Sequence, residues 1–399
     1  MTYEKAPVAG IRPEADLLLC CARTWMDSEK AACIRALLQH DLDWAYLLRT
    51  AHQHGMAPLL YWHLNATCLE AVPKDTLDQL RDHFDNNGRR NLFLTGELLK
   101  LLNLFEAYEI PVIPYKGPLL AASVYGNLAL RQFLDLDLLV HKQHVSKARE
   151  LLVSQGYRPQ FHLNGDQESA FLQSYSELCF AREDGRVIVD LHWAITSRGF
   201  SFPLDPERLW GHLEPISLGG KEVLTLCPED LLLILCVHGG KHLWERLDWI
   251  CGIAELIRVH KGMDWRRVME QAGALRSERM LFLGLYLASD LLEAALPEEA
   301  SQRVHADPVL RLLAVQMRER LFREANGPPG VLESWLFHLR LRDRLRDGCR
   351  YCLSLVMTPT GLELTLLPLP TSLFPLYYVL RPMRLLVKYG GKMLKHLLF

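Results

Sequence analysis

Two apolar stretches of the chain carry acids where an apolar residue would fold more easily. Asp135 and Asp137 lie in FLDLDLLV, and Asp190 lies in VIVDLHW. Side chains alternate between the two faces of a strand, so Asp135 and Asp137 are expected to point the same way. Three kinds of partner suit such carboxylates, namely a metal ion, a basic side chain, or water at a sheet edge.

Metal binding is the chemistry that the acids favour. Two neighbouring carboxylates raise each other's pKa in a partly dry site, and a bound cation relieves that cost. Mg²⁺, or Mn²⁺ in its place, takes oxygen ligands and is often shared between carboxylates and substrate phosphates. A third carboxylate at Asp190 can complete a metal site or accept a proton from an attacking hydroxyl.

A phosphate-binding turn is expected upstream of these acids. Lys116, Gly117 and Pro118 open a helix directly after a strand-like run. Free amides at the start of a helix favour an anion, and Lys116 adds a positive charge.

The elements that position these residues form a compact α/β unit. Strands are expected at 110–115 and 133–140, with a short helix between them, and a further helix at 144–156. Two more strand-like runs flank Asp184-Gly185, a dipeptide suited to a tight hairpin turn.

Helices are expected on both sides of this unit. Apolar residues recur at three and four spacing from about residue 13 to 102 and again after Pro228. We therefore predict an α+β fold in which a small mixed-sheet core is flanked by N-terminal and C-terminal helical regions. The expected divisions are an N-terminal helical region at 1–90, the α/β core at 91–218, a helical domain at 219–325, and a helical, basic and amphipathic tail at 326–399 that begins with a linker, NGPPG.

Composition excludes some classes of partner. The 399 residues include 45 Lys plus Arg and 47 Asp plus Glu, so the net charge is -2. A protein with this charge has no overall positive potential that would attract a long nucleic acid.

Ten cysteines, mostly in apolar runs, suggest free thiols in a reducing cytoplasm. We expect neither a signal peptide nor a membrane-spanning run.

The order of these motifs resembles a known family. KGPLL, Arg131, DLDLLV, VDLHW and HGGKHLWERLDWI follow one another as in an uncharacterised bacterial nucleotidyltransferase family of the DNA polymerase beta-like superfamily, often found beside polysaccharide and peptide-modification genes. Abortive-infection toxin nucleotidyltransferases show a similar series. The resemblance covers roughly residues 90–260. Pro118 and Gly252 depart from the family pattern, the latter standing where an acid is expected.

The resemblance implies roles for individual residues. Asp135 and Asp137 would bind the metal with a nucleoside triphosphate, and Asp190 would help to hold a second metal and activate the acceptor hydroxyl. Lys116 and Gly117 would contact phosphate, and Arg131 would reach the triphosphate or the carboxylate pair. The acceptor would be a sugar, a small metabolite, a peptide or an RNA end.

Four further polar residues are auxiliary candidates. His192 lies two residues after Asp190 on the same strand face and can touch the site or pack at the strand end. His238 and His242 are one helical turn apart, a spacing found in zinc sites, with Lys241 beside them. Support for a nucleotide or an acceptor, and hydrogen bonding between helices, are the alternatives to zinc.

The C-terminal segment mixes cations with apolar residues, namely Arg381, Arg384, Lys388, Lys392 and Lys395. Such a segment can lie on an anionic membrane surface, peripheral to the inner membrane face, or pack on the protein's own helices.

Two other functions compete with nucleotidyl transfer. An Asp-x-Asp motif also occurs in metal-dependent glycosyltransferases that use a nucleotide sugar, although these enzymes usually place a longer α/β region ahead of the motif. The other alternative is a non-catalytic scaffold with a degenerate nucleotide pocket.

Overall fold

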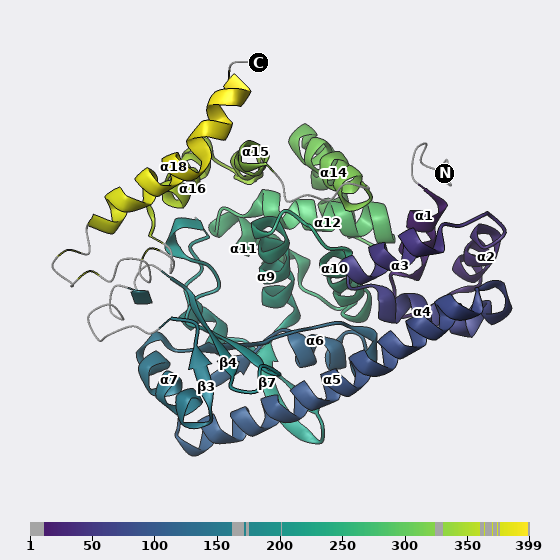
Figure 1. Ribbon diagram of the computed structural model, residues 1–399, viewed down its shortest axis with the longest axis horizontal. Coiled ribbons are helices and arrows are strands. Elements are labelled where there is room, and N and C mark those ends of the chain that lie inside the picture. The colour runs from purple at the N-terminus through teal and green to yellow at the C-terminus, as the bar shows by residue number, and fades with distance from the viewer. Residues whose placement is uncertain are drawn as a thin grey trace.

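The fold combines a small sheet with helices formed by the segments before and after it (Figure 1). The computed structural model describes residues 12–161, 171–172, 175–200, 202–323, 330–359 and 376–397, with residues 363, 369 and 373. The α+β class expected from the sequence is confirmed, including the mixed sheet between two helical regions.

The helices before the sheet form one packed group. They are α1 (Pro13–Cys21), α2 (Ser28–Leu37), α3 (Trp44–Gln53), α4 (Ala57–Thr67) and α5 (Lys74–Ala107). The long helix α5 runs from this group along one side of the molecule to the sheet (Figure 1). It buries Leu94, Leu98 and Phe105 against the sheet. The expected division after residue 90 falls inside this helix.

The main sheet has the strand order β1-β2-β5-β4-β3. Its strands are β1 (Val112–Pro114), β2 (Leu136–Val140), β3 (Tyr157–Pro159), β4 (Glu177–Arg182) and β5 (Ile188–His192). β2 and β5 are parallel, whereas the other neighbours are antiparallel. Because β2 and β5 are central, β2 is buried along its whole length.

The expected hairpin at Asp184-Gly185 is confirmed. Gly185 has a φ of +68°, a value that glycine adopts at no steric cost, and Arg182 N–H donates to the Val187 carbonyl at 2.9 Å. The pairing of β4 with β5 extends directly from this turn.

The connections around the sheet follow the expected turns. α6 (Gly117–Ser123) follows β1, and α7 (Val145–Ser154) follows β2. Gly126 and Gly156, beyond the ends of these helices, have positive φ values. One detail was wrong, since Asp135 lies just before β2 rather than inside the strand.

A second hairpin leads from the sheet to the later helices. It pairs β6 (Leu213–Leu218) with β7 (Lys221–Leu226), and Thr225 Oγ1 donates to the Pro114 carbonyl at 2.7 Å. The expected division between residues 218 and 219 therefore falls inside this hairpin.

The later helices pack around α9, α10 and α12, which contact one another. They are α9 (Pro228–Lys241), α10 (Leu247–Val259), α11 (Trp265–Ala274), α12 (Glu278–Leu292), α13 (Glu298–Ala306), α14 (Pro308–Leu321), α15 (Val331–Leu341), α16 (Leu345–Met357) and α18 (Tyr377–Leu397). The NGPPG linker, apart from Gly330, lies outside the described residues.

Two of the C-terminal cations have partners within the protein. Arg381 and Arg384 both pair with the buried Glu363 carboxylate. The side chains of Lys388, Lys392 and Lys395 lie outside the described part of the chain, so membrane contact stays a prediction. Among the helices described, none combines the length and the apolar character that crossing a bilayer requires.

Candidate functional site

Strand pairing brings the three acids together. In the parallel register of β2 and β5, Asp137 lies directly beside Asp190, and Asp135 stands two residues earlier on the same chain. All three line one cavity of about 250 Å³.

The partner of Asp137 is a basic side chain. Lys116 Nζ donates to Asp137 Oδ1 at 3.1 Å, and His192 Nε2 lies 3.1 Å from the same oxygen. Asp137 is only 7% exposed, so both contacts are made in a nearly dry environment. Within the described residues, no three His, Cys, Asp or Glu side chains are already arranged as metal ligands.

The three carboxyls differ in their charge balance. Burial alone would raise the pKa of Asp137, but Lys116 and His192 hold it well below its usual range. Burial, and then the Asp137 charge, raises the pKa of Asp135 to about 6 and also raises the pKa of Asp190. The negative charge at Asp135 and Asp190 is therefore under-compensated, which favours binding of a further cation.

Gly117 forms the turn between β1 and α6 for a steric reason. Its φ is +49°, and a Cβ at this position would lie 3.2 Å from the Asp135 carbonyl oxygen. The turn and the acid-bearing segment therefore pass each other at close range. α6 has seven residues and Pro118 lacks an N–H, so the positive charge at the start of this helix comes from Lys116 rather than from a long helix dipole.

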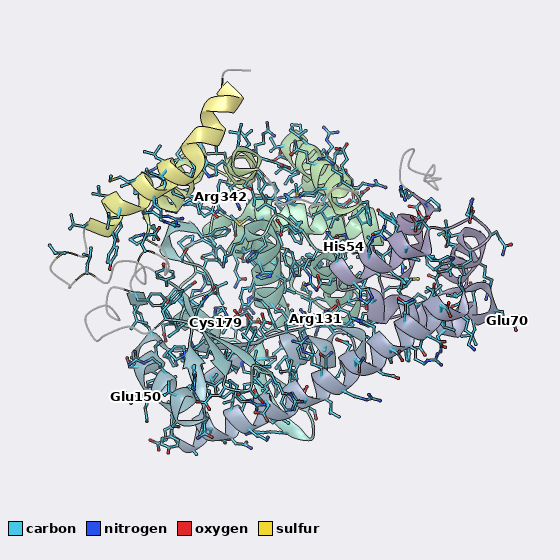
Figure 2. The ribbon with its side chains drawn as sticks, in the orientation of Figure 1. His54, Glu70, Arg131, Glu150, Cys179 and Arg342 are labelled. Carbon is cyan, nitrogen blue, oxygen red and sulfur yellow. The ribbon has the colours of Figure 1, made fainter. Side chains whose placement is uncertain are left out.

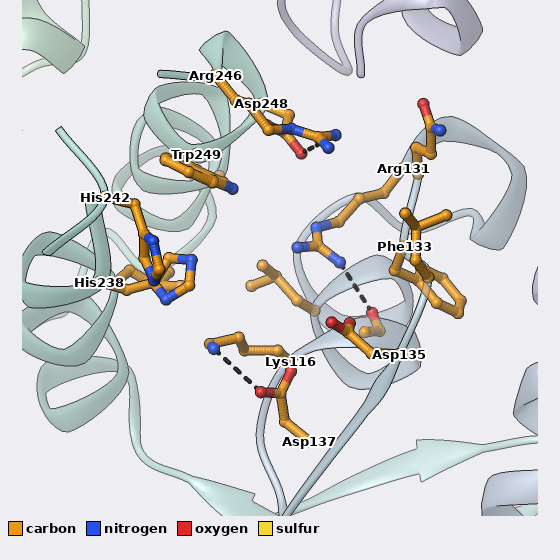
Figure 3. Close-up of a pocket in the computed structure, with 16 residues that line it drawn as sticks. Lys116, Arg131, Phe133, Asp135, Asp137, His238, His242, Arg246, Asp248 and Trp249 are labelled. Atoms are coloured by element: carbon orange, nitrogen blue, oxygen red, sulfur yellow. Dashed lines mark hydrogen bonds and ion pairs between the residues drawn. The ribbon is translucent and has the colours of Figure 1, made fainter. Parts of the chain in front are cut away.

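Arg131 bridges these two segments. Its Nη1 donates to the Gly117 carbonyl at 3.4 Å, and its charge counteracts part of the rise in the pKa of Asp135 (Figure 3). Figure 2 labels Arg131 and, on the sheet, Cys179. Residues of the sheet and of α9 (Pro228–Lys241) together line the cavity that contains the acids, so the site lies between the sheet and the later helices.

The backbone before β2 is held by two asparagines that the sequence analysis missed. Asn91 Nδ2 of α5 donates to the Leu128 and Arg131 carbonyls at 2.7 and 2.6 Å, and Asn87 Nδ2 donates to the Ala129 carbonyl at 2.9 Å. Both are buried polar residues on the apolar face of α5, which is the signal that was available.

Glu177 is a second residue that was missed. Its carboxylate lies 3.2 Å from His192 Nδ1, opposite the ring nitrogen that faces Asp137. Burial opposes this charge, but His192, Lys241 and Lys116 together lower the pKa of Glu177. A tight turn at Asp184-Gly185 implies that residue 177 pairs with 192 and 179 with 190, so the hairpin register contained this information.

The helical wall of the site carries the other auxiliary residues. His238 of α9 and His242, which directly follows α9, have ring centroids 4.7 Å apart, and these centroids lie 5.1 and 5.7 Å from the Trp249 ring of α10. Burial lowers the pKa of His238 well below its usual value and that of His242 to about 4, and nearby lysines add to both shifts. The structure pairs these rings with an aromatic side chain and shows no zinc ligand set among the described residues. Lys241 lines the cavity that contains the acids.

Another cavity, of about 210 Å³, adjoins the cavity of about 250 Å³. Both are lined by Lys116, Asp135, Asp137, His238 and His242. Gly117, Arg131 and Trp249 line only the 210 Å³ cavity, whereas Asp190, Glu177 and Lys241 line only the other. We call the 210 Å³ cavity the first cavity and the 250 Å³ cavity the second cavity; they share Lys116 and the Asp135–Asp137 pair.

Comparison with known proteins identifies the family. Residues 40–293 match the family described as uncharacterised nucleotidyltransferase, and the chain belongs to that family. It is thus a nucleotidyltransferase, with a nucleotide as substrate, and the resemblance seen in the sequence is confirmed. No match is found among the curated proteins.

One solved structure is similar to part of the chain. It is the crystal structure of an antigenic nucleotidyltransferase-like protein from Paracoccidioides brasiliensis, with 15% identity over 53% of this chain and 95% of that chain and a TM-score of 0.30. At that TM-score the likeness adds nothing to the family assignment. The elements before β1 are helical in the described residues, without the longer α/β region typical of nucleotide-sugar glycosyltransferases.

Proposed function

We propose that the protein transfers a nucleoside monophosphate from a nucleoside triphosphate to an acceptor hydroxyl, with Mg²⁺ or Mn²⁺ as cofactor. The observation that carries this proposal is the parallel register of Asp137 with Asp190, with Asp135 lining the same cavity. Three carboxylates from two chain segments therefore face one space.

These residues fit a divalent cation. Their donors are carboxylate oxygens, and the raised pKa values of Asp135 and Asp190 mark negative charge that Lys116 does not balance. Asp135, Asp137 and Asp190 would hold the ion. When bound, it would neutralise the phosphate charge and orient the triphosphate.

The two cavities divide the substrates. The first cavity has Gly117 and Arg131 in its wall and suits the triphosphate, whose charge Lys116 and Arg131 offset. The second cavity alone contains Asp190 and suits the acceptor. Both substrates then meet at the Asp135–Asp137 pair.

The reaction follows from this placement. The acceptor oxygen forms a bond to the α-phosphorus while the bond from that phosphorus to the bridging oxygen breaks, and pyrophosphate leaves. Asp190 Oδ accepts the hydroxyl proton, a task that its raised pKa favours. Asp137 holds the nearby His192 ring at Nε2, and the Glu177 carboxylate lies 3.2 Å from Nδ1 on the other side of that ring.

The acceptor is a sugar, a small metabolite or a peptide, as in polysaccharide or peptide modification. A net charge of -2 disfavours a long nucleic acid. The cytoplasm is the expected location, and the C-terminal cations would add peripheral membrane contact, which flotation with anionic liposomes tests.

A labelling experiment tests this function. The protein is incubated with each α-labelled nucleoside triphosphate, Mg²⁺ and a cell extract, and mass spectrometry identifies the molecule that gains a nucleotide. Labelling should disappear in the double variant Asp135→Asn, Asp137→Asn and persist in Asp85→Asn, which removes an exposed acid of α5. Equal labelling by the double variant would exclude this site, and no labelling by the wild-type protein with any nucleotide would favour the scaffold alternative.

A further inference from the structure

The first cavity has a wall that the triphosphate contacts leave unused. Arg246, Asp248 and Trp249, at the start of α10, lie across the cavity from Lys116 and Asp137 (Figure 3). The cavity between Lys116 and this wall has room for the sugar and base of a nucleotide whose phosphates lie at Lys116 and Arg131.

Arg246 is fixed in place by a buried acid. Its Nε donates to Asp248 Oδ1 at 2.9 Å and its Nη2 to Asp248 Oδ2 at 3.0 Å, while Asp248 is 5% exposed. Gly55 makes room for the guanidinium, because a Cβ there would lie 2.5 Å from Nη2. A bidentate pair of this kind holds the guanidinium plane rigidly.

The fixed guanidinium retains unused donors. Within the described part of the chain, the Asp248 carboxylate is the partner of Arg246, through Nε and Nη2, and Nη1 has none. An arginine side chain can only donate hydrogen bonds, so Nη1 requires an acceptor atom on a ligand or water.

Trp249 supplies an aromatic surface beside this donor. Its indole is partly exposed and lines the first cavity, with His238 and His242 packed against it. Because burial lowers the pKa of both histidines, they are uncharged near pH 7. An uncharged aromatic wall suits a planar base better than it suits a phosphate.

We propose that Trp249 and Arg246 form the nucleobase subsite of the first cavity, in which the base stacks on Trp249 and a ring carbonyl accepts from Arg246. This inference rests on the proposed function and adds the substrate class. Guanine and uracil present carbonyl oxygens, whereas adenine presents an amino group in the corresponding position, so GTP or UTP binds more tightly than ATP.

Equilibrium binding separates base contacts from phosphate contacts. Dissociation constants are measured by calorimetry in Mg²⁺ for GTP, UTP, ATP and inorganic tripolyphosphate. Trp249→Ala weakens binding of the preferred nucleotide about tenfold or more and leaves tripolyphosphate unchanged. Trp265→Ala, a matched loss of a partly buried indole on α11 away from both cavities, leaves all four constants unchanged.

A second variant tests the role of the guanidinium. Arg246→Lys keeps a cation beside Asp248 but loses the fork, so the preference for GTP or UTP over ATP falls severalfold while tripolyphosphate binding stays constant. A merely structural role would shift all four ligands together.

The outcomes distinguish the two proposals. If nucleotides and tripolyphosphate bind and Trp249→Ala changes neither, or if ATP binds as tightly as GTP and UTP, the base subsite is overturned and the proposed function stands. If neither nucleotides nor tripolyphosphate bind to the wild-type protein, both are overturned.

Discussion

Buried charge is handled differently in two regions of the protein. At the site, Asp135, Asp137 and Asp190 line cavities, and two of them have raised pKa values. In the helical region, Arg342 is 1% exposed and lies 4.0 Å above the Phe200 ring and 4.7 Å from the Tyr351 ring. Figure 2 shows Arg342 well apart from Cys179 and Arg131.

The two regions also differ in access. Arg342 lines neither the first nor the second cavity, and its Nε and Nη2 lack hydrogen-bond partners among the described residues. Burial lowers the pKa of Arg342 to about 10, so Arg342 stays charged near pH 7. The Phe200 and Tyr351 rings compensate part of the free-energy cost of burying this charge. A bound ligand can neutralise the charge of the acids that line a cavity. The charge of the enclosed Arg342 can be stabilised only by the side chains packed around it. The first arrangement therefore indicates function and the second indicates structure.

The largest expected effect concerns the acids. Asp137→Asn and Asp190→Asn should each reduce nucleotide transfer about a thousandfold, because each removes a charge that faces the reacting groups. Circular dichroism and thermal melts verify folding, and the labelled-product assay measures the rate. Wild-type rates in either folded variant would contradict the contrast between the two regions.

Removing Arg342 should affect stability rather than transfer. Arg342→Ala is expected to lower the free energy of unfolding by about 3 kcal/mol, because it leaves a cavity between Phe200 and Tyr351. Arg342→Met, which keeps much of the volume, should cost less. Urea denaturation gives both values, and transfer per folded molecule should stay within about twofold of wild type. A large loss of transfer in folded Arg342→Met would place this residue in the site.

Removing a site acid should stabilise the metal-free protein. The pKa of Asp135 is raised from 3.8 to about 6, so its ionisation destabilises the fold as pH rises through that interval. Asp135→Asn should raise the free energy of unfolding by about 3 kcal/mol at pH 8 in EDTA and by little at pH 4. Equal effects at both pH values would show that charge is not the cause.

The smallest effect concerns a buried histidine next to Arg342. Burial, and then the Arg342 charge, lowers the pKa of His338 to about 3, so its stabilising contribution is present above pH 6.5 and is lost as pH falls toward 3. Protonation of His338 on unfolding should account for less than about 1 kcal/mol of the decrease in the free energy of unfolding between pH 7 and pH 6. His338→Gln should remove that part of the slope in urea titrations, and the exposed His40→Gln should not. An unchanged slope would argue against burial of an uncharged ring.

Much of the α/β core could be predicted because its signals are local. Alternating apolar residues, the Asp184-Gly185 turn and glycines at helix ends depend on neighbours in the chain, and β4, β5, α6 and α7 follow them. The two Asn residues of α5 escaped prediction because their partners are 37 to 44 residues away in the chain, beyond the reach of local patterns. Glu177 lies 15 residues from His192, and the register of the hairpin implied this pairing, whereas the apolar pattern of each strand alone did not.

The sequence by itself determined which residue types are present and in what order. It also predicted the elements beside Lys116, Gly117, Arg131 and the acids, because these elements form locally. Only the tertiary structure decided that Asp137 pairs with Lys116, that Asp190 lies beside it, and that Trp249 lines the same cavity as Arg131. The reason is physical, because a charge or ring far along the chain reaches the site only after strands pair and helices pack, and burial then sets the strength of every interaction there.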